Sequence, residues 1–115
     1  GAVVMVKYVP EKGDFVIISF TPQSGHEQRG RRPAIVVSSK LFNKATGMIL
    51  VCPVTSSKRY SPFHVPVTDA ASVSGEIMLE QIKSIDYKCK KVQFIEKASE
   101  EVLNEVLSIM DAIVY

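Results

Sequence analysis

The hydrophobic period of the chain changes once, near residue 98, and this change constrains the fold more than any other feature. Before it, apolar residues come in short runs rich in β-branched and aromatic side chains, which are typical of strands. After it, apolar residues recur at spacings of three and four, which indicates an amphipathic helix packed on a sheet. The pattern predicts a mostly β fold, a small and mostly antiparallel barrel with a C-terminal helix.

The apolar runs and turn residues give the expected limits of each strand. We expect strands at 15–20, 34–39, 48–52, 63–67, 76–79, 83–87 and 92–95. The second run is continuously apolar and should be buried on both faces. Pro53 should stop the third strand, and Pro66 favours an edge position for the fourth, with His64 on the same side as Pro66.

Two helices are expected. Ser99 is an N-cap for a helix that ends near Ile113, because acidic residues follow it where the helix dipole favours them. A single helical turn is expected over residues 40–44, with Ser39 as its cap. Phe42 and Phe63 are expected in the core.

The 115 residues fit one domain, which we expect to span the whole chain. Met5 is expected to be the natural start, which leaves residues 1–4 as a tag remnant or other extension. No apolar run approaches the roughly 20 residues that cross a bilayer, so the cytoplasm is the expected location. Cys52 and Cys89 are expected to be reduced and half-buried rather than zinc ligands.

The net charge of +2 is weak evidence for a nucleic-acid partner, and the placement of the cations says more. The basic residues form three clusters, which are Arg29 with Arg31 and Arg32, Lys58 with Arg59, and Lys88 with Lys90 and Lys91. If the fold brings two clusters to one face, they would attract phosphates. Each cluster alone could equally be a set of solvated loop charges.

The most informative segment is the polar loop expected from Thr21 to Arg32. It carries an imidazole, a carboxylate and an amide at His26, Glu27 and Gln28. Pro33 favours extended geometry at the residue before it, which would place the Arg32 guanidinium at the mouth of the second strand. Such a guanidinium can bind a phosphate through two parallel hydrogen bonds.

A second polar segment leaves the third strand at Thr55. If the second and third strands are neighbours, Thr55 and Arg32 could meet at one end of the sheet. RNA supplies its own nucleophile, the 2′-OH, so an enzyme needs only to remove its proton, stabilise charge on phosphorus and protonate the leaving oxygen. The segment lacks the carboxylate-rich pattern of a magnesium site, so we expect no metal and no cofactor.

Five motifs occur in one order along the chain. They are Gly13-Asp14, Gly25-x-Glu27-Gln28-x-Gly30-x-Arg32-Pro33, Phe42-Asn43, Pro53-x-Thr55 and Gln81-Ile82-Lys83-Ser84-Ile85-Asp86. In this order the chain resembles the MazF/PemK family of toxins from Tyr8 to the terminal helix. The resemblance implies an SH3-like barrel, a symmetric homodimer, and a cognate antitoxin whose extended acidic tail occupies the RNA groove.

The resemblance also implies sequence-specific cleavage of single-stranded messenger RNA that leaves a 2′,3′-cyclic phosphate and a 5′-hydroxyl. By motif match the catalytic residues are Arg32, Thr55 and Glu27. The expected RNA contacts are Gln28, Arg29, Arg31, Ser56, Ser57, Lys58, Arg59, Gln81 and Lys83. In the Kid branch a later arginine–aspartate pair is catalytic, but Met78 takes the place of that arginine here. The general base therefore stays open between Glu27, His26 and Glu80.

Simpler readings accompany these assignments. Arg32 could form a structural ion pair with Glu27 or Glu80, Thr55 could only satisfy a turn, and His64 could be an exposed edge-strand residue. A related barrel poisons DNA gyrase by binding it, and a degenerate toxin could survive as an antitoxin or RNA binder. The loop with Glu27, Gln28 and Arg32 argues against the gyrase binder, which has no need of it, and the presence of Arg32 and Thr55 argues against the degenerate toxin.

Overall fold

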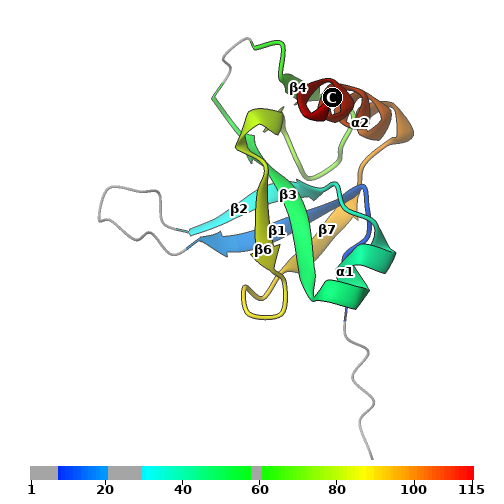
Figure 1. The fold of residues 1–115 in the computed structure, drawn as a ribbon. Coiled ribbons are helices and arrows are strands. Elements are labelled where there is room, and N and C mark those ends of the chain that lie inside the picture. The colour runs from blue at the N-terminus through cyan, green and yellow to red at the C-terminus, as the bar shows by residue number, and fades with distance from the viewer. Residues whose placement is uncertain (1–7, 21–29, 58–60) are drawn as a thin grey trace, which may run out of the picture.

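The computed structural model describes residues 8–20, 30–57 and 61–115, and its strands curl around one another beside a C-terminal helix (Figure 1). The elements in chain order are β1 (Asp14–Phe20), β2 (Gly30–Val36), α1 (Lys40–Thr46), β3 (Met48–Thr55), β4 (His64–Val67), β5 (Gly75–Met78), the 3-10 helix η1 (Leu79–Gln81), β6 (Lys83–Asp86), β7 (Gln93–Lys97) and α2 (Glu100–Val114). The predicted change from strands to helix near residue 98 is confirmed.

The strands form one curled sheet in the order β4-β5-β3-β2-β1-β7, with β6 as an additional partner of β3. Every pairing is antiparallel. β3 pairs with β6 over its first half and with β5 at its end, so two strands share one of its edges. This fork curls the sheet into a partial barrel, and the prediction of a small antiparallel barrel with a C-terminal helix is confirmed.

The two faces of the sheet bury separate apolar clusters. The β6-side cluster consists of Val16, Ile18, Ala34, Val36, Ile49, Val51, Ile85 and Tyr87. The helix-side cluster includes Phe15, Ile35, Cys52, Val54, Ile77 and Leu79 together with Val102 and Val106 of α2. Consecutive residues of β2 and β3 enter opposite clusters, as strand alternation requires. The prediction that the second strand is buried on both faces is confirmed.

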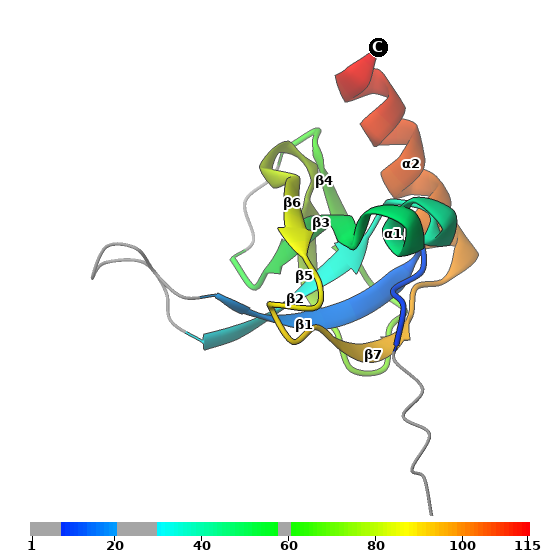
Figure 2. The ribbon, with the colours of Figure 1, turned by 60° about the horizontal axis from the view of Figure 1, so that its bottom comes forward.

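Both helices begin where the sequence predicts. Ser99 caps α2 by accepting a hydrogen bond from the Val102 N–H, and the C-terminal half of α2 leads away from the sheet (Figure 2). Ser39 caps α1 in the same way, and Gly47 ends α1 in a left-handed conformation with φ of 73°. No helix within residues 8–20, 30–57 and 61–115 is long and apolar enough to span a bilayer.

The expected limits of two strands are wrong, and the second strand, expected at 34–39, also ends earlier, at Val36. β2 begins at Gly30, so Arg31 and Arg32 belong to the strand rather than to the loop. β3 continues through Pro53 to Thr55. The Val37 N–H donates to the Leu50 carbonyl, and hydrogen-bonded pairs alternate along the ladder, so the nitrogen of Pro53 faces away from β2. It lies between the β6 and β5 pairings, where a missing donor costs no ladder bond.

Four burial predictions also need correction. Cys89 is exposed in the turn after β6, whereas Cys52 is fully buried, and both are free thiols. Phe42 and Phe63 are 41% and 44% exposed rather than core residues. The helix α1 instead buries Asn43, whose amide donates to the carbonyls of Pro10 and Ser38. Asn43 of the Phe42-Asn43 motif therefore anchors α1.

Candidate active site

Arg32 and Thr55 come from strand ends that meet at one end of the sheet. In the β2–β3 register, Ala34 lies opposite Pro53 in the last recorded pair. Continued by two residues, this register brings Arg32 level with Thr55. Residues two or four apart on a strand lie on the same face, so Arg32 shares a face with Ala34, and Thr55 shares one with Val51. Ala34 and Val51 are both members of the β6-side cluster. The guanidinium and the hydroxyl therefore belong to the same end and the same face of the sheet.

Lys83 adds a third polar group to this face. It lies opposite Val51 in the β3–β6 register, and Ile85, two residues further along, belongs to the β6-side cluster. Lys83 is exposed, and it takes part in an interaction within the structure. Gln81, in η1, is also exposed just before it. Together with Arg32, Lys83 gives this face a second cation that could contact a phosphate.

Thr55 and Arg32 differ in whether their polar side chains find partners among the described residues. The Thr55 Oγ1 accepts a hydrogen bond of 3.1 Å from the Ser57 N–H, as the simpler turn reading requires, and its hydroxyl proton can still be donated. Arg32 is half-buried, and no ion pair joins it to any residue that the structure describes, Glu80 included. A half-buried guanidinium in this state is suited to an external anion.

Arg31 faces the other way. Alternation places it on the opposite side of β2 from Arg32, where its guanidinium donates a hydrogen bond to the Gln93 side chain of β7. Ser56 and Ser57 are exposed beyond the end of β3. The structure thus brings Arg32, Thr55 and Lys83 to one face but leaves Arg31 on the other.

A close backbone contact that the sequence analysis missed fixes Thr55. Gly75 begins β5 with a φ of 121°, and a Cβ at this position would lie 2.2 Å from the Thr55 carbonyl oxygen. Only glycine fits such an approach. Next to it, Glu76 pairs with Thr55 across the β3–β5 ladder. The one available signal was an isolated glycine directly before the strand predicted at 76–79.

A second feature that the sequence analysis missed is a histidine between two carboxylates. The His64 side chain is 9% exposed rather than an open edge-strand residue. Its Nδ1 lies 3.0 Å from the Glu76 Oε1, and its Nε2 lies 3.1 Å from the Glu80 Oε2. Glu80, one candidate for the general base, is therefore held by a side chain of β4. Its charge also helps burial raise the pKa of the Cys52 thiol to about 12.

Several predicted site residues lie outside the described residues. These are His26, Glu27, Gln28, Arg29, Lys58 and Arg59. Their assignments stay predictions. Within the part of the chain that is described, no group of three or more histidine, cysteine, aspartate or glutamate side chains is placed to hold a metal ion.

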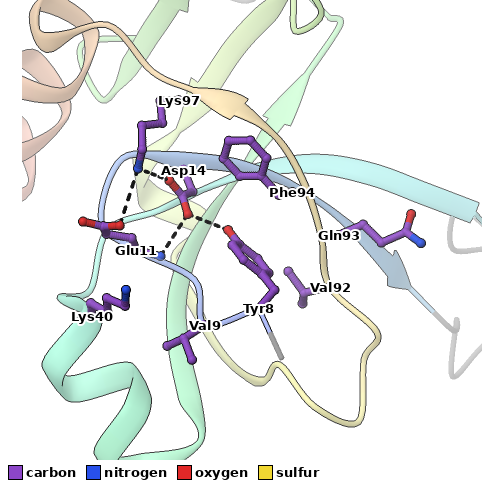
Figure 3. Close-up of a pocket in the computed structure, with 9 residues that line it drawn as sticks. All are labelled: Tyr8, Val9, Glu11, Asp14, Lys40, Val92, Gln93, Phe94 and Lys97. Carbon is purple, nitrogen blue, oxygen red and sulfur yellow. Dashed lines mark hydrogen bonds and ion pairs between the residues drawn. The ribbon is translucent and has the colours of Figure 1, made fainter. Parts of the chain in front are cut away.

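A cavity of about 610 Å³ lies at the other end of β1, around Asp14 (Figure 3). Asp14 is 2% exposed, and its carboxylate accepts hydrogen bonds from the Tyr8 hydroxyl, the Glu11 N–H and the Lys97 ammonium. Burial, and then the hydrogen bond to Asp14, raises the pKa of Tyr8 above its ordinary value. Because the chain supplies every partner of this carboxylate, the Gly13-Asp14 motif has a structural role here.

Comparison with known proteins finds similar chains over most of the length of this one. A family model described as "PemK-like, MazF-like toxin of type II toxin-antitoxin system" matches residues 11–114. The chain is 38% identical over 109 residues to the endoribonuclease toxin ChpB of Escherichia coli strain K12, covering 90% of this chain and 93% of that protein. It is 38% identical over 84 residues to the endoribonuclease toxin MazF of the same strain, covering 73% and 75%.

Solved structures of MazF proteins are also similar to this chain. A crystal structure of MazE-MazF (Form-II) from Deinococcus radiodurans superposes with a TM-score of 0.85 at 38% identity, covering 94% of this chain and 97% of that chain. A crystal structure of MazF (Form-I) from the same organism has a TM-score of 0.82 at 38% identity, covering 94% and 98%. The likeness extends over nearly the whole chain in both cases.

Proposed function

This chain belongs to the PemK-like, MazF-like family of type II toxins and is an endoribonuclease, and we propose that it cleaves single-stranded messenger RNA at specific sequences without a metal ion. The observation that carries the proposal is the shared face of Arg32 and Thr55 at one end of the sheet. A guanidinium and a hydroxyl there can surround one phosphodiester from two strands.

The proposed reaction uses the 2′-OH of the RNA as nucleophile. Its oxygen forms a bond to phosphorus as the bond from phosphorus to the 5′-oxygen breaks, which gives a 2′,3′-cyclic phosphate and a 5′-hydroxyl. A general base takes the 2′-proton, and an acid supplies a proton to the leaving 5′-oxygen. Arg32 stabilises the additional negative charge on the phosphoryl oxygens, and Thr55 donates a hydrogen bond to one of them.

The base is proposed among Glu27, His26 and Glu80. Of the three, Glu80 lies in the described part of the chain, and the contact with His64 fixes its direction. Glu27 is also proposed as a catalytic residue, because of its position in the loop motif.

Substrate binding is proposed to extend beyond the scissile phosphate to further polar and basic side chains. The proposed contacts are Gln28, Arg29, Arg31, Ser56, Ser57, Lys58, Arg59, Gln81 and Lys83. Cations would bind the backbone phosphates, and amides and hydroxyls would read base edges of an unpaired strand.

A cognate antitoxin is the proposed protein partner, because similar chains have been solved as MazE-MazF complexes. An extended acidic segment of the antitoxin would compete with RNA for Arg32 and Lys83 by charge complementarity. We also propose a homodimer acting in the cytoplasm, where its substrate is. Light scattering of the antitoxin-free protein, with twice the chain mass expected, tests the dimer.

The direct test is incubation of the purified, antitoxin-free protein with a long mixed-sequence RNA in EDTA, followed by mapping of the new ends. We expect discrete cleavage sites, 5′-hydroxyl ends that accept phosphate from a kinase, and 3′ ends that resist ligation until the cyclic phosphate is opened. An Arg32→Ala preparation made in parallel identifies contaminating ribonucleases.

Intact RNA after incubation with folded, wild-type protein would overturn the proposal. Cleavage that occurs only when a divalent metal is restored would overturn its metal independence alone. Arrest of DNA replication before protein synthesis in expressing cells would favour gyrase binding instead.

A further inference from the structure

His64 joins three elements through its two ring nitrogens. It belongs to β4, and it contacts Glu76 of β5 on one side and Glu80 of η1 on the other. We propose that His64 is a positioning residue, which in its doubly protonated form holds Glu80 in the orientation that the ribonuclease reaction uses. This inference rests on the proposed function, because Glu80 is one of its candidate bases.

The two contact distances favour a protonated ring. A neutral imidazole carries one N–H, so only one of its nitrogens can donate to a carboxylate. The other would place a lone pair against the second carboxylate oxygen, which is repulsive. With both nitrogens protonated, both contacts become charge-assisted hydrogen bonds.

Among the described residues, several carboxylates lie around the ring. A cavity of about 290 Å³ beside His64 is also lined by Glu76 and by Glu105 of α2. The carboxylates that surround His64 therefore come from β5, from η1 and from the helix packed over them. The buried Cys52 of β3 lies near Glu80 as a neutral thiol. Nearby negative charge stabilises the protonated imidazole.

The two carboxylates differ in their exposure to water, and this difference determines which contact His64 loses first when it is deprotonated. The Glu76 side chain is 19% exposed, and the Glu80 side chain is 43% exposed. When His64 loses one proton, the remaining N–H stabilises the fold more by staying with Glu76, which water solvates less. Glu80 is then the carboxylate that is released into solvent.

The held state also ties Glu80 to the strand that carries Thr55. Glu76 pairs with Thr55 across the β3–β5 ladder, and Gly75 packs directly on the Thr55 carbonyl. His64 therefore connects Glu80 to the part of β5 that fixes Thr55. Loss of this connection should lower kcat through misplacement of Glu80 while leaving RNA binding, and hence KM, nearly unchanged.

The test is a pH profile of RNA cleavage for the wild type, His64→Gln and His64→Lys. The wild-type kcat should fall as pH rises through the range in which histidine titrates, between about pH 5 and 8. His64→Gln should lower kcat about tenfold or more at the acidic end, as loss of an orienting partner does elsewhere. Its KM should stay within about twofold, and the histidine-dependent fall should be absent.

His64→Lys separates position from charge. A lysine keeps a cation that can reach a carboxylate but does not titrate in this range, so it should restore much of the activity and remain insensitive to pH. Glu101→Gln, an exposed carboxylate in the first turn of α2, is the matched control and should behave as the wild type. In a Glu80→Gln background, His64→Gln should have no further effect on kcat.

Two measurements keep the inference falsifiable even if His64→Gln does not fold. Nitrogen NMR of the wild-type ring should show both nitrogens protonated at about pH 6, and a neutral single tautomer there would overturn the inference. An unchanged pH profile in folded His64→Gln would also overturn it, while wild-type cleavage would leave the proposed function standing. RNA left intact by the wild type would instead reject the function itself.

Discussion

The two ends of the β1–β2 hairpin hold polar groups in opposite situations. Asp14, at the start of β1, is buried, and three donors from the chain satisfy its carboxylate. Arg32 lies opposite Ile18, near the other end of β1, and forms no ion pair with a described residue. A polar group whose partners are all internal stabilises the fold, whereas one that lacks them is available to a ligand.

The largest expected effect is on catalysis, at the Arg32 end. Arg32→Ala should lower the rate of RNA cleavage by about 100-fold to 1,000-fold, because it removes the cation that stabilises charge on the phosphate. The free energy of unfolding should change by no more than about 0.5 kcal/mol, since no ion pair with a described residue is lost. Single-turnover cleavage and urea denaturation measure the two quantities.

The matched comparison is Arg31→Ala, one residue away on the other face of β2. It should weaken RNA binding without a comparable loss of the cleavage step. If Arg32→Ala destabilised the protein strongly while its folded fraction cleaved RNA normally, Arg32 would belong with Asp14 as a structural residue.

The next effect is on stability, at the Asp14 end. Asp14→Ala should lower the free energy of unfolding by about 3 kcal/mol, because it removes an acceptor shared by Tyr8, Glu11 and Lys97 in a buried setting. For a domain of this size the melting temperature should fall by roughly 10 °C. Asp69→Ala, at an exposed aspartate, is the control and should change stability little.

Cleavage by the folded fraction of Asp14→Ala should remain near that of the wild type. A large loss of cleavage at temperatures where this variant is fully folded would show that the two ends are coupled, and the distinction between them would fail. Circular dichroism at the assay temperature establishes the folded fraction.

Gly75 tests whether the functional end needs support from its own backbone. Gly75→Ala places a methyl group against the Thr55 carbonyl and strains a φ of 121°, so stability should fall by about 1–3 kcal/mol. Because β5 must shift relative to Thr55, cleavage should fall as well, which distinguishes this variant from Asp14→Ala. Gly47→Ala is the control, since a Cβ there meets nothing within 4 Å and only the φ of 73° is strained.

Much of the fold could be predicted from signals between residues that are close in the sequence. The N-cap at Ser99 and the three-and-four spacing after it predict α2, because capping and amphipathicity depend on neighbouring residues. The placement of Arg32 and Thr55 followed from motif order and from the expectation that β2 and β3 are neighbours. These inferences needed only one pairing between adjacent strands.

Contacts between distant segments could not be predicted in the same way. His64 meets Glu76 and Glu80 only because the β4–β5 register places them together, and register is invisible in one sequence. The ion pair between Asp14 and Lys97 joins residues 83 positions apart. Pro53 was misjudged because its tolerance depends on a change of strand partner along β3.

The smallest expected effect concerns alkaline pH and again separates the two ends. Burial and Asp14 raise the pKa of Tyr8 above its ordinary 10.0, and the hydrogen bond to Asp14 raises that of Lys97 above 10.5. The folded state therefore keeps these protons at a pH where the unfolded state releases them. Their contribution to stability is complete below about pH 10 and is lost as pH rises further.

Tyr8→Phe should isolate the tyrosine part of this loss. At pH 7 the variant should be about 1 kcal/mol less stable, because one hydrogen bond to Asp14 is gone. Between pH 9 and about 11 its stability should decline less steeply than that of the wild type, since the Tyr8 phenol is no longer present to ionise on unfolding. Cys52, whose pKa burial raises from 9.0, adds the same decline to both proteins. Tyr115→Phe, at a residue 97% exposed, is the control and should behave as the wild type. Urea titrations across this pH range measure the free energy of unfolding. If it fell equally steeply with pH in Tyr8→Phe and in the wild type, Tyr8 would not be linked to Asp14.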